Sequence, residues 1–141
     1  MLMKQEIADI CERYGVLDLY VFGSRAREVV SLVEGRISNL EQPEPDVDIG
    51  ILPADKETWT PEKKVEFSIE LEDRFQVHRV DLILLPEADA FLALDIIRGE
   101  LLYCADLDDQ ARYELFVLRR AGDLLPFQKA RTRMILKEGG R

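Results

Sequence analysis

Three aspartates stand where a carboxylate is unfavourable without a partner. Asp46 and Asp48 are two residues apart in the apolar stretch DVDIGIL, so in a strand both side chains point to the same face. Two co-facial carboxylates repel each other unless water or a cation lies between them. Asp81 interrupts the apolar stretch RVDLILLP, where burial is costly unless the carboxylate is paired or binds a metal. If the two strands are neighbours, the three carboxylates converge and can hold two metal ions beside phosphate groups.

Gly23 and Ser24 form a second candidate site, at the end of the apolar stretch VLDLYVF. Glycine permits a tight turn and a close backbone approach. A helix that begins at Ser24 would offer free N–H groups to an anion, and arginines suit phosphate geometry. We therefore take Gly23 and Ser24 as a candidate phosphate cradle, with Arg25 as a further candidate for phosphate contact.

Both features also have a purely structural explanation. Gly23-Ser24 is compatible with ordinary turn and helix N-cap chemistry. The Asp46/Asp48 pair is compatible with a solvated strand mouth after the proline-rich stretch EQPEP. Asp81 favours the functional interpretation, because a carboxylate inside a strongly apolar segment is costly to bury without a partner.

The elements that must position these residues follow from periodicity and from glycine and proline signals. We expect helices over residues 3–14, 25–33, 61–75 and 88–99, and from 106 onward. We expect strands over residues 16–22, 46–52, 78–85 and 100–104, and a loop over 35–45. Thr60 is a plausible N-cap, with Pro61 at the first helical position. This order predicts an α/β (α+β) fold, with a small mixed sheet flanked by helices and a C-terminal helix.

The final helix is expected to bury one apolar stripe, and Pro126 is expected to kink or break the helix. The stripe predicted from helical spacing consists of Ala111, Leu115, Leu118, Gly122 and Leu125.

Composition bounds the class of protein. A chain of 141 residues with 47% hydrophobic residues suits a single domain over residues 1–141, with its core at about 3–105 and a helical segment at about 106–137. No apolar run approaches the length of a membrane span, and the acidic residues near the N-terminus argue against a signal peptide. The two cysteines lack metal-ligand spacing and suit a reducing compartment, so a cytoplasmic location is expected.

Charge argues against nucleic acid as a stable ligand, because the chain has a net charge of −9. The charge is uneven: residues 112–141 hold eight basic and three acidic side chains. A basic tail on an acidic body suits an acidic protein partner, and the alternative is a solvated helix face.

The motifs FGSR, DVDIGIL and VDLILL, in this order after an N-terminal helix, resemble the minimal nucleotidyltransferase (MNT) family of the DNA polymerase-β superfamily. The downstream stretch ADAFLALDIIRGELLYCAD resembles it too, so the likeness spans roughly residues 3–125. The resemblance implies transfer of AMP from ATP to an acceptor hydroxyl, with release of pyrophosphate. Minimal nucleotidyltransferases of this size often pair with a HEPN-domain RNase toxin, as the antitoxin that adenylylates a tyrosine on it.

Carried onto this chain, the resemblance assigns triphosphate binding to Gly23 and Ser24. Asp46 and Asp48 would bind two Mg²⁺ ions. Asp81 would complete the shell of the catalytic ion and help to deprotonate the acceptor. Arg25 has no firm family role and stays a candidate for phosphate contact.

The spacing departs from the family pattern in one place. Residues 25–45 separate Ser24 from Asp46, and the family usually has a clearly shorter gap. The segment EVVSLVEGRISNLEQPEP looks like an insertion, which can fold out as a surface loop, cover the site, or move Ser24 out of register.

Two other functions are compatible with the sequence. One is a catalytically impaired binding module that keeps the fold and masks a protein partner. The other is a small-molecule nucleotidyltransferase, for example one acting on an antibiotic, which is disfavoured because no second domain is evident. A homo-oligomer is compatible with either, and the acceptor and the base preference are not readable from the sequence.

Overall fold

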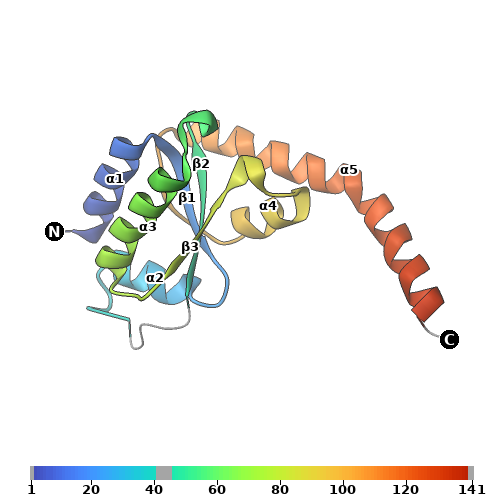
Figure 1. Ribbon diagram of the computed structural model, residues 1–141, viewed down its shortest axis with the longest axis horizontal. Helices are drawn as coiled ribbons and strands as arrows, with labels where there is room; N and C mark the ends of the chain where they lie inside the picture. The colour runs from blue at the N-terminus through green and yellow to red at the C-terminus, as the bar shows by residue number, and fades with distance from the viewer. Residues whose placement is uncertain (1, 41–45, 140–141) are drawn as a thin grey trace.

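The computed structural model describes residues 2–40 and 46–139, and within the last helix it describes side chains up to Phe127. The elements follow the order predicted from the sequence, with two short 3-10 helices added (Figure 1). In chain order they are α1 (Met3–Tyr14), β1 (Val16–Phe22), α2 (Ala26–Val33), β2 (Val47–Pro53), η1 (Lys56–Thr58), α3 (Pro61–Phe75), β3 (Val80–Leu84), η2 (Leu85–Glu87), α4 (Ala90–Ile97), β4 (Glu100–Cys104) and α5 (Leu107–Gly139).

Local signals account for most of the boundaries. Gly15 takes a left-handed conformation and ends α1, and the Thr60 side chain accepts a hydrogen bond from the Lys63 N–H, as an N-cap does. α4 begins two residues later than predicted, because the Asp89 carboxylate caps it by accepting from the N–H groups of Phe91 and Leu92.

The four strands form one mixed sheet in the order β3-β2-β1-β4. β1 pairs antiparallel with β2 and with β4, whereas β2 and β3 run parallel. The strands that carry Asp48 and Asp81 are therefore direct neighbours, as the site hypothesis requires.

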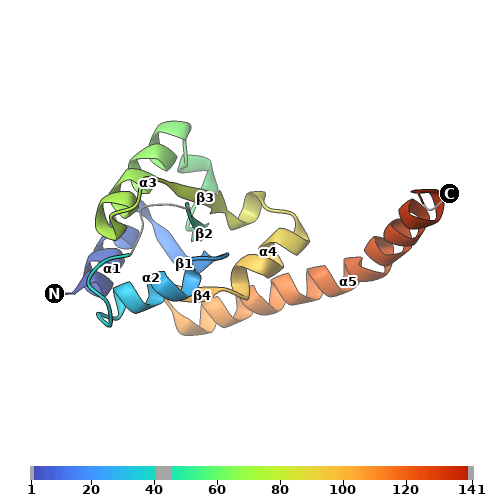
Figure 2. The ribbon, with the colours of Figure 1, turned by 90° about the horizontal axis from the view of Figure 1, so that it is seen from below.

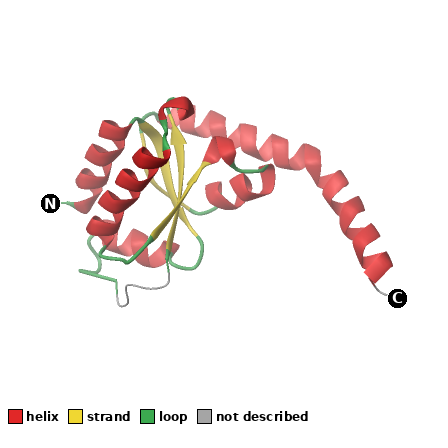
Figure 3. Cartoon of the chain, viewed as in Figure 1, coloured by secondary structure: helices red, strands yellow, loops and turns green. Residues whose placement is uncertain are grey.

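Helices cover both faces of this sheet (Figures 2 and 3). Side chains of α1, α2 and α3 pack on one face, in a core that includes Leu19, Ile49 and Phe67. α4 and α5 cover the other face, in a second core that includes Tyr20 and Ile96. Alternate strand residues thus face different helical layers, as the pleat of a strand dictates.

The segment that resembled an insertion is largely part of the fold. α2 takes up residues 26–33 and buries Val29, Leu32 and Val33, and beyond it Leu40 is buried in the same core. Residues 41–45, the end of the predicted loop, lie outside the described residues.

The predicted apolar stripe of α5 is wrong. In the part of α5 whose side chains are described, up to Phe127, the buried residues are Gln110, Val117 and Ala121, whereas Leu115 and Leu118 are about half exposed. α5 has apolar residues on more than one face, so periodicity alone did not identify the face that packs on the sheet. A polar contact helps to fix it: the buried Gln110 amide and the Glu114 carboxylate both hydrogen-bond the Tyr20 hydroxyl on β1.

α5 also continues through Pro126 without a break, which the sequence left open as a kink or a stop. Figure 1 shows the helix leaving the body of the molecule and bending in the second half of its length. Within the described residues, no helix is long and apolar enough to cross a membrane.

Asp18 on β1 is buried beneath α5 and gives the fold a pH dependence. Burial, and then repulsion by Glu114 and by Asp109, raises its pKa from 3.8 to about 6. The folded state therefore binds this proton more tightly than the unfolded chain does, and stability falls as the pH rises from about 4 through about 6. We expect Asp18→Asn to raise the melting temperature at neutral pH.

The measurement is thermal unfolding of parent and variant at about pH 4 and about pH 7.5. The gain should be present only at the higher pH, and Asp108→Asn, at an exposed position, is the matched control. An equal gain at both values of pH would show that the Asp18 charge is not the cause.

Candidate active site

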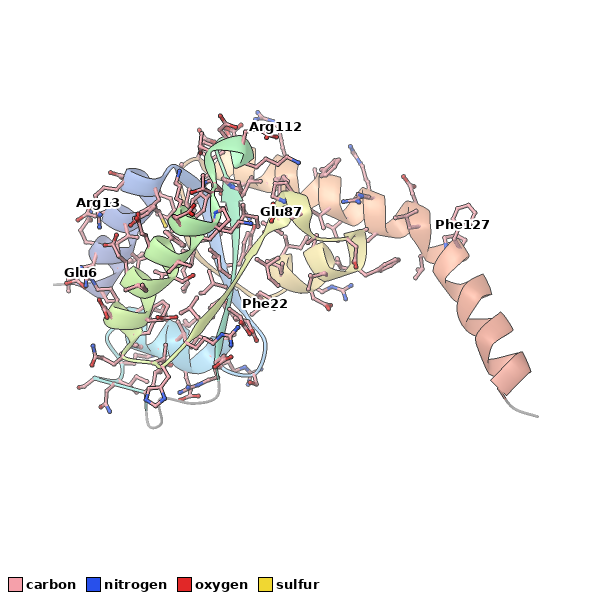
Figure 4. The ribbon with its side chains drawn as sticks, viewed as in Figure 1. Glu6, Arg13, Phe22, Glu87, Arg112 and Phe127 are labelled. Atoms are coloured by element: carbon pink, nitrogen blue, oxygen red, sulfur yellow. The ribbon has the colours of Figure 1, made fainter. Side chains whose placement is uncertain are left out.

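The site is built where the end of β1 meets the beginnings of β2 and β3. Phe22 pairs with Asp48 across the β1–β2 ladder, and Asp48 pairs with Asp81 across the β2–β3 ladder. The sheet therefore places the Gly23-Ser24 turn and both strand aspartates at the same end of the sheet, where β1 ends and β2 and β3 begin. In Figure 4, Phe22 marks this end of the sheet, and Arg112 lies at the opposite end.

Gly23 fits this position because it has no side chain. Its φ of +79° is in the left-handed region, and a Cβ built on it would collide with the Asp48 carboxylate. The backbone at the turn thus runs directly against one of the three carboxylates.

Ser24 is exposed at the same turn, and α2 begins two residues later, at Ala26. Arg25, not Ser24, occupies the N-cap position of α2, and its side chain makes no capping bond. Simple N-cap chemistry therefore does not explain Ser24. The longer spacing to Asp46 has not moved the turn away from Asp48, because Gly23 still contacts it.

The three carboxylates lie on the face of the sheet that α4 and α5 cover. Asp48, Gly50 and Leu52 alternate along β2 on this face, and a Cβ at Gly50 would collide with Ile96 of α4. α4 therefore packs closely on β2 just beyond Asp48. The side chains of Asp46 and Asp81 are 38% and 44% exposed.

The electrostatics of Asp48 reflect this crowding. Burial raises its pKa above the ordinary value of 3.8, and repulsion by Asp81 and then by Asp46 raises it further. A carboxylate with this environment is destabilised when it is ionised, and a nearby cation relieves the cost.

Arg79 brings a positive charge to the site that the sequence analysis missed. Its Nη2 lies 3.3 Å from Oδ1 of Asp81, and its Nε lies 3.8 Å from Oδ2 of Asp46. The signal was present, because Arg79 and Asp81 are two residues apart at the start of a strand and so share a face. The guanidinium bridges two of the three predicted metal ligands.

Arg25 is placed differently from an exposed phosphate ligand. Its side chain is 4% exposed, and its Nε donates to Oε1 of Glu28 at 3.2 Å. The guanidinium therefore lies inside the turn region, against α2, and a role in phosphate contact stays a prediction.

The donor set suits Mg²⁺ in kind, because Mg²⁺ prefers carboxylate oxygens and shares its shell with substrate phosphates. As the side chains stand, however, no three His, Cys, Asp or Glu residues in the described part of the chain are arranged to hold a metal ion. Instead, Arg79 forms ion pairs with both Asp46 and Asp81. Asp46, Asp48 and Asp81 thus lie at the same end of the sheet, with Arg79 paired to two of them.

A groove of about 370 Å³ runs beside Asp81, between α3 and the edge strand β3. Its walls combine exposed apolar side chains of α3, Val65 and Ile69, with polar groups of Lys64 and Ser68. The groove lies on the β3 side of the carboxylates, whereas Gly23 and Ser24 lie on the β1 side.

Comparison with known proteins agrees with this geometry. Residues 5–108 match the family described as "Polymerase beta, Nucleotidyltransferase". The match covers most of the chain and all three candidate aspartates, and the chain belongs to this nucleotidyltransferase family. No curated protein matches the sequence.

Solved structures show the same fold. A chain of a toxin–antitoxin complex with AMP-PNP has a TM-score of 0.71 and 18% identity, covering 94% of this chain and 98% of that one. A chain of the complex of tri-AMPylated Shewanella oneidensis HEPN toxin with MNT antitoxin has a TM-score of 0.68 and 18% identity, with coverage of 95% and 96%. A minimal nucleotidyltransferase has a TM-score of 0.51 and 22% identity, with coverage of 69% and 85%. The fold is therefore that of a polymerase-β-like nucleotidyltransferase with a C-terminal helix.

Proposed function

We propose that this protein is a Mg²⁺-dependent nucleotidyltransferase that moves AMP from ATP to a hydroxyl of a partner protein, a tyrosine of a HEPN-domain toxin. One observation carries the proposal: Gly23, Asp48 and Asp81 lie next to one another at the same end of the sheet. This is the arrangement that a phosphate cradle beside metal-binding carboxylates requires. The chain would act as the antitoxin of the pair, in the cytoplasm.

Each residue has a role in the proposed reaction. The backbone of Gly23 and the hydroxyl of Ser24 hold the triphosphate by hydrogen bonds. Asp46 and Asp48 would supply carboxylate oxygens to the metal ions, and Asp81 would help to hold the catalytic ion and accept the proton of the acceptor hydroxyl. Bound Mg²⁺ would stabilise the charge that develops on the reacting phosphate and its leaving group.

The bond changes are those of an in-line displacement. The acceptor oxygen forms a bond to the α-phosphorus of ATP, and the bond from that phosphorus to the bridging oxygen of the β-phosphate breaks. Pyrophosphate leaves with the electron pair, and the partner carries AMP on its hydroxyl oxygen.

This geometry sets the direction from which the acceptor comes. In an in-line displacement the attacking and leaving oxygens lie on opposite sides of the phosphorus. Because the proposed triphosphate cradle is on the β1 side, the acceptor enters from the β3 side. The groove between α3 and β3 opens there, next to Asp81.

The proposed protein partner has a matching surface on α5. Phe116 is 55% exposed and Phe127 is 73% exposed, and Figure 4 shows Phe127 pointing away from the body. Arg112, Arg119 and Arg120 line a hollow beside Phe116. Large exposed apolar side chains among arginines are typical of protein interfaces. The neighbours that contain a HEPN toxin or an ATP analogue support the same partner and substrate.

The test is a transfer assay with ATP labelled on the α-phosphate. This protein, Mg²⁺ and a candidate HEPN-domain partner are mixed, and the label is followed on both chains. We expect the label on a tyrosine of the partner, with release of unlabelled pyrophosphate. No transfer to the partner by a protein that binds ATP and Mg²⁺ would rule out the proposed acceptor.

The α5 surface gives a separate prediction. Phe116→Asp should weaken binding of the partner by at least about fivefold, because loss of an interface aromatic at an energetic hot spot costs more than about 1 kcal/mol. Binding is measured by calorimetry, and melting temperature serves as the check on folding. Leu2→Asp, at a similarly exposed apolar position (59%) before α1, is the matched control for the added charge. Unchanged affinity of the Phe116 variant would place the partner elsewhere.

A further inference from the structure

Arg79 has no part in the proposed reaction, yet it contacts two of its three carboxylates. The guanidinium reaches Asp81 at 3.3 Å and Asp46 at 3.8 Å, with a side chain that is 69% exposed. Holding an exposed arginine side chain in one conformation costs conformational entropy, and exposed ion pairs are usually weak. Here two carboxylates that repel a third one, Asp48, share a single cation. This single cation therefore offsets part of the repulsion among the three carboxylates.

The position of Arg79 is one that a metal ion needs. The guanidinium is paired with Oδ2 of Asp46 and Oδ1 of Asp81, one oxygen of each carboxylate. A metal ion that binds either of these two oxygens must displace Arg79 from it.

We propose that Arg79 is the resident counter-ion of the metal-free site, and that it opposes the entry of free divalent metal. The inference rests on the proposed function, because it takes Asp46 and Asp81 as metal ligands. Arg79 and the metal ion compete for the same two carboxylates, so the affinity for metal is reduced by the fraction of molecules in which Arg79 is paired with them.

The same residue favours metal that arrives with nucleotide. A displaced guanidinium next to a bare divalent ion is repelled by it. When the metal enters with a triphosphate, the added phosphates are strong acceptors for an arginine. Arg79 therefore discriminates against metal alone and in favour of the metal–nucleotide complex.

The experiment measures binding of Mn²⁺ alone by electron paramagnetic resonance of the free ion, since Mn²⁺ takes the same oxygen ligands as Mg²⁺. Arg79→Gln should bind Mn²⁺ at least about fivefold more tightly than the parent, the lower end of ordinary coupling energies. With α,β-methylene-ATP present, the advantage of the variant should vanish or reverse. The matched control is Arg112→Gln, which removes one equally exposed arginine (72%) from the opposite end of the sheet.

Thermal unfolding in EDTA gives an independent readout. Arg79→Gln should lower the melting temperature without metal, because the carboxylates lose their counter-charge, and Mn²⁺ should then raise it by more than in the parent. Equal or weaker Mn²⁺ binding by Arg79→Gln, with binding intact in the parent, would overturn the role of Arg79 and leave the proposed function standing. Absence of Mn²⁺ binding in both proteins, with or without nucleotide, would overturn both.

Discussion

Asp48→Asn should abolish nucleotidyl transfer and yet make the protein more stable. Bound metal supplies several kcal/mol of charge stabilisation, and about 4 kcal/mol corresponds to about a thousandfold in rate. Asp48 carries the raised pKa of a buried carboxylate next to Asp81 and Asp46, so its charge is a cost to the metal-free fold. The neutral amide removes that cost without changing the shape of the side chain. The rate is measured by label transfer from ATP, and stability by thermal unfolding in EDTA.

The stability gain of Asp48→Asn should depend on pH. Because the raised pKa means that the folded state holds the Asp48 proton more tightly than the unfolded chain, the parent loses stability as the pH rises. The gain of the variant should therefore grow between about pH 4 and about pH 7. Asp73→Asn, at an exposed position on α3, is the control and should change neither quantity. Full activity of Asp48→Asn would exclude this carboxylate from the reaction.

Gly23→Ala should remove nucleotide binding and lower stability. Gly23 has a φ of +79°, which costs an L-residue about 1 kcal/mol or more, and the added Cβ would collide with the Asp48 carboxylate. The melting temperature should fall by roughly 4 °C or more. Affinity for α,β-methylene-ATP with Mg²⁺, measured by calorimetry, should fall below detection, because the turn and the carboxylate are both displaced.

Gly35→Ala separates backbone strain from the site. Gly35 has a φ of +80°, with no atom within 4 Å of the position of its Cβ, so the strain is the same and the collision is absent. This variant should lose stability and keep its nucleotide affinity. If Gly23→Ala binds nucleotide as well as Gly35→Ala does, the turn is not the phosphate cradle.

The convergence of the three carboxylates was predictable because two simple rules decide it. Strand parity puts Asp46 and Asp48 on one face, and the cost of an aspartate in an apolar strand marks Asp81. The remaining condition, that the two strands are neighbours, was a hypothesis, and the parallel β2–β3 pairing confirms it. The Gly23 turn was predictable in type, but its contact with Asp48 depends on the β1–β2 register, which the sequence does not encode locally.

The packing of α5 and the bridge from Arg79 were not predictable in this way. α5 has apolar side chains around most of its surface, and the buried side is decided by Gln110 and its contact with Tyr20, ninety residues apart in the chain. Arg79 precedes an apolar strand, where a basic residue usually means a solvated end. Only the pairing of β3 with β2 brings it to Asp46. Both depend on contacts distant in sequence.

The most direct test of the central claim is calorimetric titration of the protein with α,β-methylene-ATP, which cannot be cleaved at the α-phosphate. The titration is run with Mg²⁺ and with EDTA, and repeated with Asp48→Asn. The account predicts binding that requires Mg²⁺ in the parent and is lost in the variant. Equal binding with and without metal, or binding unchanged by Asp48→Asn, would contradict a nucleotide site made by the Gly23 turn and the three carboxylates.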